Sequence, residues 1–446
     1  MPKIEYVIKR SGAVVPFTPE RITNAIYRAA VAVGGRDRST AEELTRQVVA
    51  MLEAQASPDH TPTIEEIQDV VEKVLIENGH ARVAKAYILY RDERNRARQE
   101  RARLASRPSE NIPWAKIWHI LDWAVEHGVN TVDGLNERIR RGEYARIVKE
   151  SEAAYNEDVE NAAEMIGSRA HELKMVFIAG PSSSGKTTTT MKLAQRLKRM
   201  KMRLVTLNVD NYFFDLELHP KDEFGDFDFE TPQALDLAMI NAHLVRLTQG
   251  EEVLIPYYDF KTGRRTNDRT PLKLNKNEVI LIDSLHGLYP DMTRDVPDEK
   301  KFKLYLEPLL QMKGPDGRYV RWADLRLIRR MLRDASYRAY DPRRTLEHWH
   351  YVRASEMRNI IPHINETDYI VNSGMPYELP IYRRRMLDQF AAWVEQYKGD
   401  PLREDASTRV ERVHHLLQAV EAVADDSAIP RDSVLREFIG GSSYAY

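Results

Sequence analysis

Nine residues near the middle of the chain have the spacing of a phosphate-binding loop. Gly180 to Thr188 read GPSSSGKTT, which fits the pattern GxxxxGK[ST]. An apolar run of strand length, Met175 to Ala179, precedes them, and a helical pattern follows from Thr187 to Met200. The two glycines let backbone N–H groups turn toward phosphate oxygens, and the positive end of the helix dipole adds to that attraction. The run therefore predicts a nucleoside triphosphate site.

The residue types within this loop suggest separate roles. Lys186 is expected to reach the β- and γ-phosphates of ATP, and Thr187 is expected to ligate Mg²⁺. A glycine-serine turn that matches by chance is the alternative, and the strand before it and the helix after it favour the loop. The predicted nucleotide contacts are Gly180, Pro181, Ser182, Ser183, Ser184, Gly185, Lys186, Thr187 and Thr188.

Two carboxylates follow apolar runs that have the length of buried strands. Asp210 comes after Leu204 to Val209, and Asp283 comes after Val279 to Ile282. Open parallel sheets bind ligands beyond the carboxyl ends of their strands, so both side chains are placed to face a ligand. We expect Asp283 to orient Mg²⁺, and Asp210 to act as general base and to touch the metal shell. A turn-forming or helix-capping role is the alternative for either residue.

A cluster of arginines occupies residues 324 to 338, which read DLRLIRRMLRDASYR. On a helix, Arg326, Arg330 and Arg333 fall on one face at spacings of four and three. A solvated basic helix is the ordinary interpretation of such a run. Phosphoryl transfer, however, needs positive charge over the phosphate oxygens, and guanidinium groups supply it well. Beside a phosphate loop, the run predicts a mobile arginine lid.

Elements that position these residues can be predicted from periodicity. From Leu173 onward, short apolar runs alternate with helical patterns, which is typical of a parallel sheet with crossover helices. The expected fold is therefore α/β, with a P-loop NTPase-type sheet preceded by a small, mostly helical unit that opens with a hairpin. The predicted strands of the sheet are Met175 to Ala179, Arg203 to Val209, Val279 to Asp283, Lys303 to Leu306 and Tyr369 to Asn372.

The first 98 residues are predicted to form a unit of their own. Two short strands lie around the turn at residues 10 to 12, and four helical patterns follow, one of which opens with a capping box from Thr63 to Glu66. Residues 99 to 165 are predicted to be a helical linker, and residues 166 to 446 the sheet-containing domain. The expected hairpin strands and helices are Tyr6 to Lys9, Ala13 to Pro16, Pro19 to Val33, Thr40 to Ala56, Thr63 to Asn78 and Ala81 to Arg94.

Bulk composition narrows the function classes. The 446 residues have a formal net charge of −2 and contain no cysteine, which excludes disulfides, thiolate metal sites and a cysteine nucleophile. Nothing global points to nucleic acid or an anionic membrane. The first residues lack the apolar core of a signal peptide, and no run of about 18 apolar residues occurs. A cytoplasmic protein that binds neither membrane nor nucleic acid is expected.

Several motifs together resemble the uridine kinases and the related phosphoribulokinases. GPSSSGKTT, VDNYF, FETPQALD, IPYYDF, VILIDSLHGL and the arginine run occur in the order found there, and KDEFGDFDFE, YDFKTGRR and LREFIGGSSYAY resemble a bacterial subgroup. The resemblance covers residues 166 to 446. It implies that Asp210 is the catalytic base, that Lys186 is the phosphate lysine, and that Thr187 and Asp283 form the Mg²⁺ shell. The family usually has Glu at position 283, so Asp283 could coordinate through water.

The resemblance also assigns acceptor and triphosphate contacts. Arg330 matches an arginine that holds the acceptor sugar and belongs with the catalytic residues, while Arg333 and Arg338 match those that face the triphosphate. Glu230 stands where an Asp grips ribose hydroxyls, and Tyr258 and Phe260 match aromatic residues beside the base, although core packing is the alternative for both. Two departures weaken the match for a pyrimidine, since Gly263 replaces a histidine and His348 replaces a glutamine.

The leading residues resemble an ATP-cone, a regulatory nucleotide-binding module of ribonucleotide reductases and their repressor. VIKRSGAVVPF, ERITNAI and IEEIQDVVEKVLIENGHARVAKAYILYRDER carry this resemblance. It implies that Lys9 and Arg10 contact the phosphates of a bound ATP or dATP effector. A solvated Lys-Arg pair is the ordinary alternative.

Three functions remain open at this level. The first is an ATP- and Mg²⁺-dependent kinase for a hydroxyl of a small-molecule acceptor, a nucleoside or related metabolite with uridine as first guess, regulated through the ATP-cone and assembled as a homo-oligomer. The second keeps the chemistry and uses a sugar, a sugar phosphate or a polyol as acceptor. The third is a non-catalytic nucleotide-sensing regulator, against which Lys186, Thr187, Asp210 and Asp283 argue.

Overall fold

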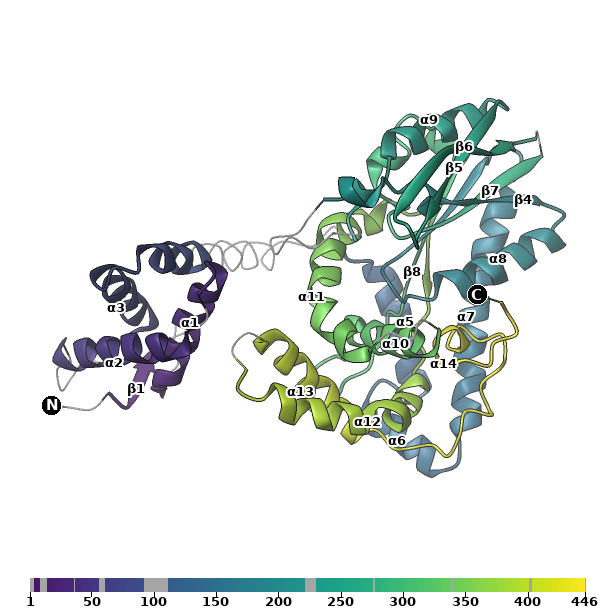
Figure 1. Cartoon of the computed structure of the whole chain (residues 1–446). Coiled ribbons are helices and arrows are strands. Elements are labelled where there is room, and N and C mark those ends of the chain that lie inside the picture. Colours follow the sequence, from purple (N-terminus) through teal and green to yellow (C-terminus); the bar gives the residue numbers. More distant parts are fainter. Residues whose placement is uncertain are drawn as a thin grey trace. The chain divides into compact units, whose positions relative to one another are not determined.

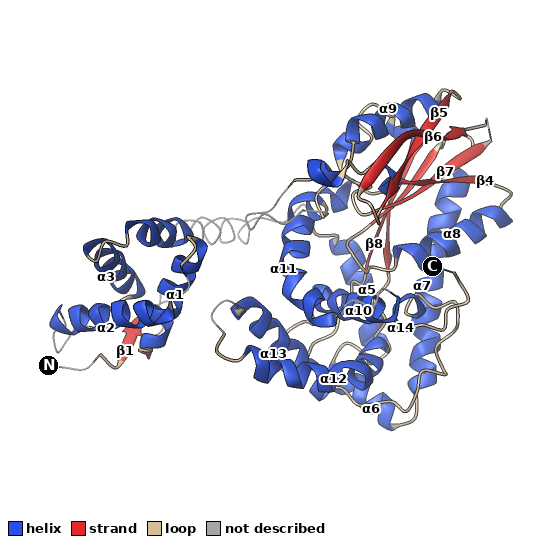
Figure 2. Cartoon of the chain, viewed as in Figure 1, coloured by secondary structure: helices blue, strands red, loops and turns tan. Residues whose placement is uncertain are grey.

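The computed structural model divides the chain into two compact units. One comprises Met1–Ser109 with Tyr397–Glu404, and the other comprises Glu110–Gln396 with Asp405–Tyr446. The smaller unit is mostly helical, whereas the larger one combines helices with strands (Figure 2). The structure describes residues 4–8, 14–35, 37–55, 61–91, 111–220, 230–275, 277–337, 341–400 and 403–445.

The smaller unit packs its helices around one apolar core beside a short antiparallel hairpin. Val48, Val71 and Leu75 are among its fully buried residues. Thr63 caps the third helix as predicted, because its hydroxyl accepts a hydrogen bond from Glu66 N at 3.2 Å while Glu66 Oε2 accepts one from Thr63 N at 2.7 Å. The elements are β1 (Tyr6–Ile8), β2 (Val14–Pro16), α1 (Pro19–Ala32), α2 (Arg38–Gln55), α3 (Ile64–Glu77) and the helical residues 81–91.

A five-stranded, fully parallel sheet forms the centre of the larger unit. Its strand order is β4-β7-β3-β8-β9, so the strand that precedes the loop lies in the middle. The predicted α/β fold is confirmed, and all five predicted strands of the sheet are present. Their bounds are β3 (Met175–Ala179), β4 (Arg203–Asn208), β7 (Glu278–Ser284), β8 (Lys301–Glu307) and β9 (Tyr369–Asn372).

Helices cover the sheet, and several of them precede it in sequence. The long helix α7 lies beside α8, which follows the loop, and it also contacts β9 (Figure 1). Residues 110 to 165, expected to be a linker, therefore pack within the larger unit. The helices are α5 (Trp114–Glu126), α6 (Val132–Arg140), α7 (Tyr144–Ser168), α8 (Lys186–Arg199), α9 (Leu237–Thr248), α10 (Trp322–Tyr337), α11 (Pro342–Asn359), α12 (Glu378–Tyr397), α13 (Glu404–Ala419) and α14 (Arg436–Ile439).

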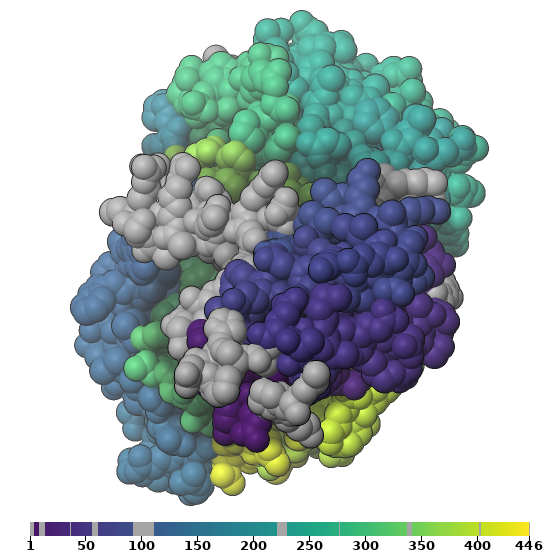
Figure 3. Space-filling model, turned by 90° about the vertical axis from the view of Figure 1, so that its left-hand side faces the viewer, coloured from purple at the N-terminus to yellow at the C-terminus, as the bar shows by residue number. Residues whose placement is uncertain are grey.

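A two-stranded antiparallel ribbon was not predicted from the sequence. It consists of β5 (Glu252–Asp259) and β6 (Arg264–Lys273), and with α9 it forms part of the teal surface at the top of Figure 3. Gly263 closes its turn with φ of 66°, and an added Cβ there would lie 2.9 Å from the Cβ of Leu216. The left-handed backbone and this short contact together favour glycine at position 263.

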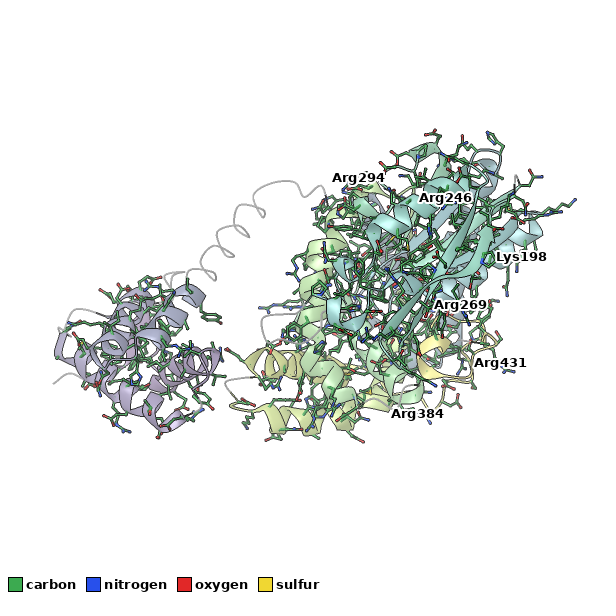
Figure 4. The ribbon with its side chains drawn as sticks, turned by 45° about the horizontal axis from the view of Figure 1, so that its top comes forward. Lys198, Arg246, Arg269, Arg294, Arg384 and Arg431 are labelled. Carbon is green, nitrogen blue, oxygen red and sulfur yellow. The ribbon has the colours of Figure 1, made fainter. Side chains whose placement is uncertain are left out.

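The surface of the larger unit carries basic side chains on many separate elements. Six labelled ones extend from α8, α9, β6, the segment after residue 292, α12 and the segment before α14, and each is exposed (Figure 4). Among the described helices, none has the length and apolar character needed to span a membrane. The labelled residues are Lys198, Arg246, Arg269, Arg294, Arg384 and Arg431.

Candidate active site

The loop between β3 and α8 has a backbone that only glycine permits at two positions. Gly185 precedes the helix with φ of 94°, and an added Cβ would lie 2.3 Å from Val434 Cγ2. At Gly180 an added Cβ would lie 2.2 Å from the carbonyl oxygen of Leu306. Both contacts are too short for any side chain, so the sequence folds locally into a tight turn that ends at the N-terminus of α8.

Polar groups of the loop have the chemistry of an anion site. The hydroxyl oxygens of Ser183 and Ser184 are buried and have no hydrogen-bond partner within the described part of the chain. Lys186 Nζ donates to the carbonyl oxygens of Gly180 at 3.0 Å and Pro181 at 3.2 Å. Buried donors without partners are costly, and phosphate oxygens would satisfy them. The residues present therefore fit a bound triphosphate.

Two buried arginines of α10 hold the loop from behind. Arg326 Nη1 donates to the carbonyl oxygen of Ser182 at 3.1 Å, and Arg329 Nη1 donates to that of Ser184 at 3.4 Å. Each guanidinium is neutralised by a carboxylate, Glu356 for Arg326 and Glu378 for Arg329. These two loop carbonyl oxygens accept hydrogen bonds from α10, and they therefore point away from the side of the loop that would face a nucleotide.

The expectation of a mobile arginine lid needs correction. Arg326 does not share an exposed face with Arg330 and Arg333, because its side chain is 0% exposed and bound in ion pairs. The helix packs in the interior of the unit, with Leu325, Leu327, Ile328 and Met331 all 0% exposed. Arg330 and Arg333 line the cavity described below, whereas Arg338 lies outside the described residues.

The two predicted carboxylates lie at the ends of adjacent strands. Asn208 of β4 pairs in register with Asp283 of β7, and Asp210 follows in a short 3₁₀ turn whose first residues are held by a bond from Asp210 N to Asn208 Oδ1 at 3.0 Å. Asp210 is exposed to solvent. Desolvation raises the pKa of Asp283 to about 6, although the Lys186 ammonium and a hydrogen bond from Thr187 act in the opposite direction.

A cavity of about 960 Å³ brings the loop and these carboxylates together. Lys186 of the loop and Phe260 of the turn between β5 and β6 both line it. Gly180, Pro181 and Thr188, also predicted as nucleotide contacts, are not among its lining residues. The predicted residues that do line it are Ser182, Ser183, Ser184, Gly185, Lys186, Thr187, Asp210, Asp283, Glu230, Phe260, Arg330 and Arg333.

Arg330 and Glu230 face each other in the cavity lining. Their Nη1 and Oε1 atoms are 3.0 Å apart, and Arg330 Nε also lies 3.5 Å from Asp334 Oδ2. Arg330 Nη1 further donates to Ser182 Oγ at 3.2 Å, which links this pair to the loop. The two residues predicted to hold an acceptor are thus adjacent and carry opposite charges.

The remaining predicted acceptor residues are divided between the cavity and its surroundings. Phe260 lines the cavity, and the ring of the buried Tyr258 lies 5.0 Å from the ring of Phe260. His348 is exposed on α11, where its ring lies 4.8 Å from that of Tyr351, and it is absent from the cavity lining. Lys9 and Arg10 of the predicted effector site lie outside the described residues.

Glu437 is among the cavity residues that were not predicted. Glu437, in α14 near the end of the chain, lines the cavity and accepts hydrogen bonds from Thr188 N at 3.1 Å and Thr188 Oγ1 at 2.8 Å. Its charge also acts on both Lys186 and Asp283. Glu437 lies 249 positions from Thr188 in the sequence, and the charged and apolar residues around it give no local pattern that predicts this contact.

The central parallel sheet, the glycine-bounded loop and the carboxylates at neighbouring strand ends define an α/β domain of the P-loop kinase class. Residues 175–379 match the phosphoribulokinase / uridine kinase family, and residues 5–96 match the ATP cone domain. The chain therefore contains an ATP-cone domain followed by a domain of the phosphoribulokinase / uridine kinase family.

Individual relatives match one or the other part. A uridine kinase of Schizosaccharomyces pombe is 28% identical over 213 residues, 47% of this chain and 42% of that protein. A uridine kinase of Chloroflexus aurantiacus is 28% identical over 201 residues, 45% of this chain and 87% of that protein. A vitamin B12-dependent ribonucleoside-diphosphate reductase of Thermoplasma acidophilum is 44% identical over 103 residues, 22% of this chain and 13% of that protein.

Solved structures also match part of this chain. One described as a possible uridine kinase from Bacillus stearothermophilus is 14% identical, covers 48% of this chain and 98% of its own, and has a TM-score of 0.31.

Proposed function

We propose that the larger unit transfers the γ-phosphoryl group of ATP to a hydroxyl of a small, uncharged acceptor, with a nucleoside such as uridine as the first candidate. The observation that carries this proposal is the shared cavity. It places Lys186 of the loop, Asp210 after β4 and Asp283 at the end of β7 around one space. Transfer to an alcohol needs a phosphate-binding cation and a carboxylate at the acceptor, and this space offers both.

The chain's own residues divide the work of the reaction. Asp210, exposed to the cavity, would accept the proton of the attacking hydroxyl. Lys186 and Arg333 would hold the phosphate oxygens as their charge redistributes. Thr187 and Asp283 would hold Mg²⁺, which would supply positive charge against the phosphate oxygens.

The donor set suits Mg²⁺ in this setting. Within the described ranges, no three His, Asp or Glu side chains are grouped closely enough to hold a metal ion by themselves. Magnesium is usually bound through one or two carboxylates together with substrate phosphates and water, so a hydroxyl and a single carboxylate suffice.

Charge balance on the acceptor side favours an uncharged acceptor. The Arg330 guanidinium is already paired with Glu230 and lies near Asp334, so it offers little net attraction to a second phosphate. The Glu230 carboxylate is a good acceptor for sugar hydroxyls, and the rings of Phe213 and Phe260 in the cavity lining suit a base. These features support a nucleoside over a sugar phosphate.

A variant of Asp210 tests the proposal. Asp210→Asn should lower kcat by about 10²- to 10⁴-fold while ATP binding changes little, because the side chain keeps its shape and loses its basicity. ADP production would be measured with nucleosides, sugars, polyols and sugar phosphates, and ATP binding by calorimetry. Asp268→Asn, the same change on the exposed strand β6, is the control. Unchanged turnover in the Asp210 variant would exclude this role.

Two further elements of the proposal concern the whole chain. The ATP-cone domain would bind ATP or dATP as an effector, and the protein would act in the cytoplasm as a homo-oligomer. The family match of residues 5–96 supports the effector site. If no acceptor in the screen yields ADP, the nucleotide-sensing regulator becomes the better description.

A further inference from the structure

The last part of the chain runs along the loop and the helix that follows it. Residues 432–444, here called the C-terminal strap, contact α8 at several points. Asp432 Oδ2 lies 2.7 Å from Lys192 Nζ, and the Tyr444 hydroxyl donates to Gln195 Oε1 at 3.2 Å. Between these contacts, Val434 packs against Gly185 and Glu437 bonds to Thr188.

Glu437 occupies the anion-binding end of α8. Its Oε2 atom receives both the backbone N–H and the hydroxyl of Thr188, and the two residues are 5% and 0% exposed. The same carboxylate lines the cavity together with Lys186 and Asp283. A negative charge at this helix end is favourable because it meets the positive end of the helix dipole.

Phosphate and the Glu437 carboxylate need the same donor. In loops of this pattern the lysine reaches the β- and γ-phosphates, and backbone N–H groups cradle the α- and β-phosphates. The N–H of Thr188 follows those of Lys186 and Thr187 in the first turn of α8 and is the next backbone donor in this series. An α-phosphate that takes this donor must displace the carboxylate, because two like charges cannot share it.

The backbone of the strap is held too firmly to leave with the carboxylate. Val434, Leu435 and Phe438 are 0% exposed, and the Arg329 guanidinium lies 5.1 Å from the centre of the Phe438 ring. Rotation of the Glu437 side chain is therefore the movement that opens the Thr188 N–H. The strap stays in place and its carboxylate changes position.

We propose that Glu437 is a residue of the donor site that takes the place of the α-phosphate when no nucleotide is bound and thereby sets nucleotide affinity. This inference rests on the proposed donor site at Lys186. Each binding event exchanges one anion for another at the Thr188 N–H, so the affinity for ATP is lower than the loop alone would provide.

Glu437→Gln tests the inference because it keeps the shape and the hydrogen-bond acceptor and removes the charge. Calorimetric titration of the full chain with MgATP and MgADP should give Kd values about tenfold lower than those of the unaltered protein. Titration with adenosine, which has no phosphate, should show no such gain. Each titration is repeated with Lys186→Met in addition, so that binding elsewhere on the chain is subtracted.

The matched control is Asp432→Asn, which removes another carboxylate of the strap that pairs with α8 outside the cavity. It should leave both Kd values unchanged. Glu437→Asp keeps the charge and shortens the side chain, so it should give intermediate Kd values. It replaces Glu437→Gln as the test if the Gln variant does not fold. Equal or weaker MgATP binding in Glu437→Gln would overturn the inference. If Lys186→Met alone left MgATP binding intact, the donor site itself would be wrong.

Discussion

Lys186 and Asp283 show how burial sets the charges of the cavity at the scale of single residues. Burial lowers the pKa of the Lys186 ammonium, and the neighbouring Asp283 opposes this shift. Burial likewise raises the pKa of Asp283 to about 6. Each group therefore stabilises the charged form of the other, and a bound cation would stabilise the Asp283 carboxylate further.

This shift predicts a pH dependence of magnesium binding. A metal ligand must be deprotonated, so the folded pKa of about 6 means that the Mg²⁺ contribution to ATP binding should decline as pH falls from 8 to 5. ATP affinity would be measured with and without Mg²⁺ across this range. ATP itself titrates in the same way with the unaltered protein and with Asp283→Asn. The variant should therefore lose only the part of the pH dependence that comes from residue 283. An identical profile in the variant would contradict the prediction.

The site residues that could be predicted are those with local signals. Lys186 belongs to a contiguous motif, and Asp210 and Asp283 each follow an apolar run that ends at the same edge of the sheet. Glu437 and the burial of Arg329 could not be predicted, because their partners lie far away in sequence. Arg329 is paired with Glu378, 49 positions on, and a run of arginines by itself suggests exposure.

At the scale of elements, α10 connects the loop with α12. Arg329 donates to Ser184 O in the loop, to Ser373 O after β9 at 2.6 Å, and to both carboxylate oxygens of Glu378 at 2.8 Å. Such a side chain is expensive to desolvate and is retained only with nearly all its donors satisfied. The helix α10, which was expected to move over the site, is instead buried and supports the loop.

Removal of this arginine should therefore be strongly destabilising. Arg329→Met leaves the Glu378 carboxylate buried without its cation, and the unfolding free energy of the larger unit should fall by about 3–5 kcal/mol. Adding Glu378→Gln should recover part of that loss. Urea unfolding followed by circular dichroism measures both, with Arg384→Met on the exposed face of α12 as control, expected within about 0.5 kcal/mol. A loss below about 1 kcal/mol for Arg329→Met would argue against the link.

The strands differ in how well they can be predicted from their sequences. β3 and β9 match their predicted bounds because the strands of a covered parallel sheet read as short apolar runs. The ribbon strand β6, RRTNDRTPLK, is almost wholly exposed and polar and contains a proline. Pairing with β5 stabilises β6. Because β6 has no buried face, its sequence shows no alternation of apolar and polar residues from which the strand could be predicted.

At the scale of the whole molecule, the chain joins two domains from separate families, each associated with nucleotides. Residues 5–96 belong to the ATP-cone match and residues 175–379 to the kinase-family match. If both bind nucleotide, binding at one site can change affinity at the other, and that coupling is reciprocal.

Nucleotide stoichiometry tests this organisation. The unaltered chain should bind two ATP molecules, and Lys186→Met should bind one, because the loop lysine is absent from the leading domain. Adding Lys9→Met and Arg10→Met should remove the second. Equilibrium dialysis with labelled ATP and dATP measures the number directly, with Lys198→Met on the exposed side of α8 as control. Loss of all binding in Lys186→Met would contradict a second site.

The contact between Thr188 and Glu437 joins residues 249 positions apart. During synthesis the loop leaves the ribosome long before the residue that caps it, so an unfinished chain presents the Thr188 N–H without its carboxylate. Contacts of such long sequence separation form late, because the intervening loop must be closed first. The nucleotide site therefore takes its final form only after Glu437 has reached Thr188, and the strap provides that step.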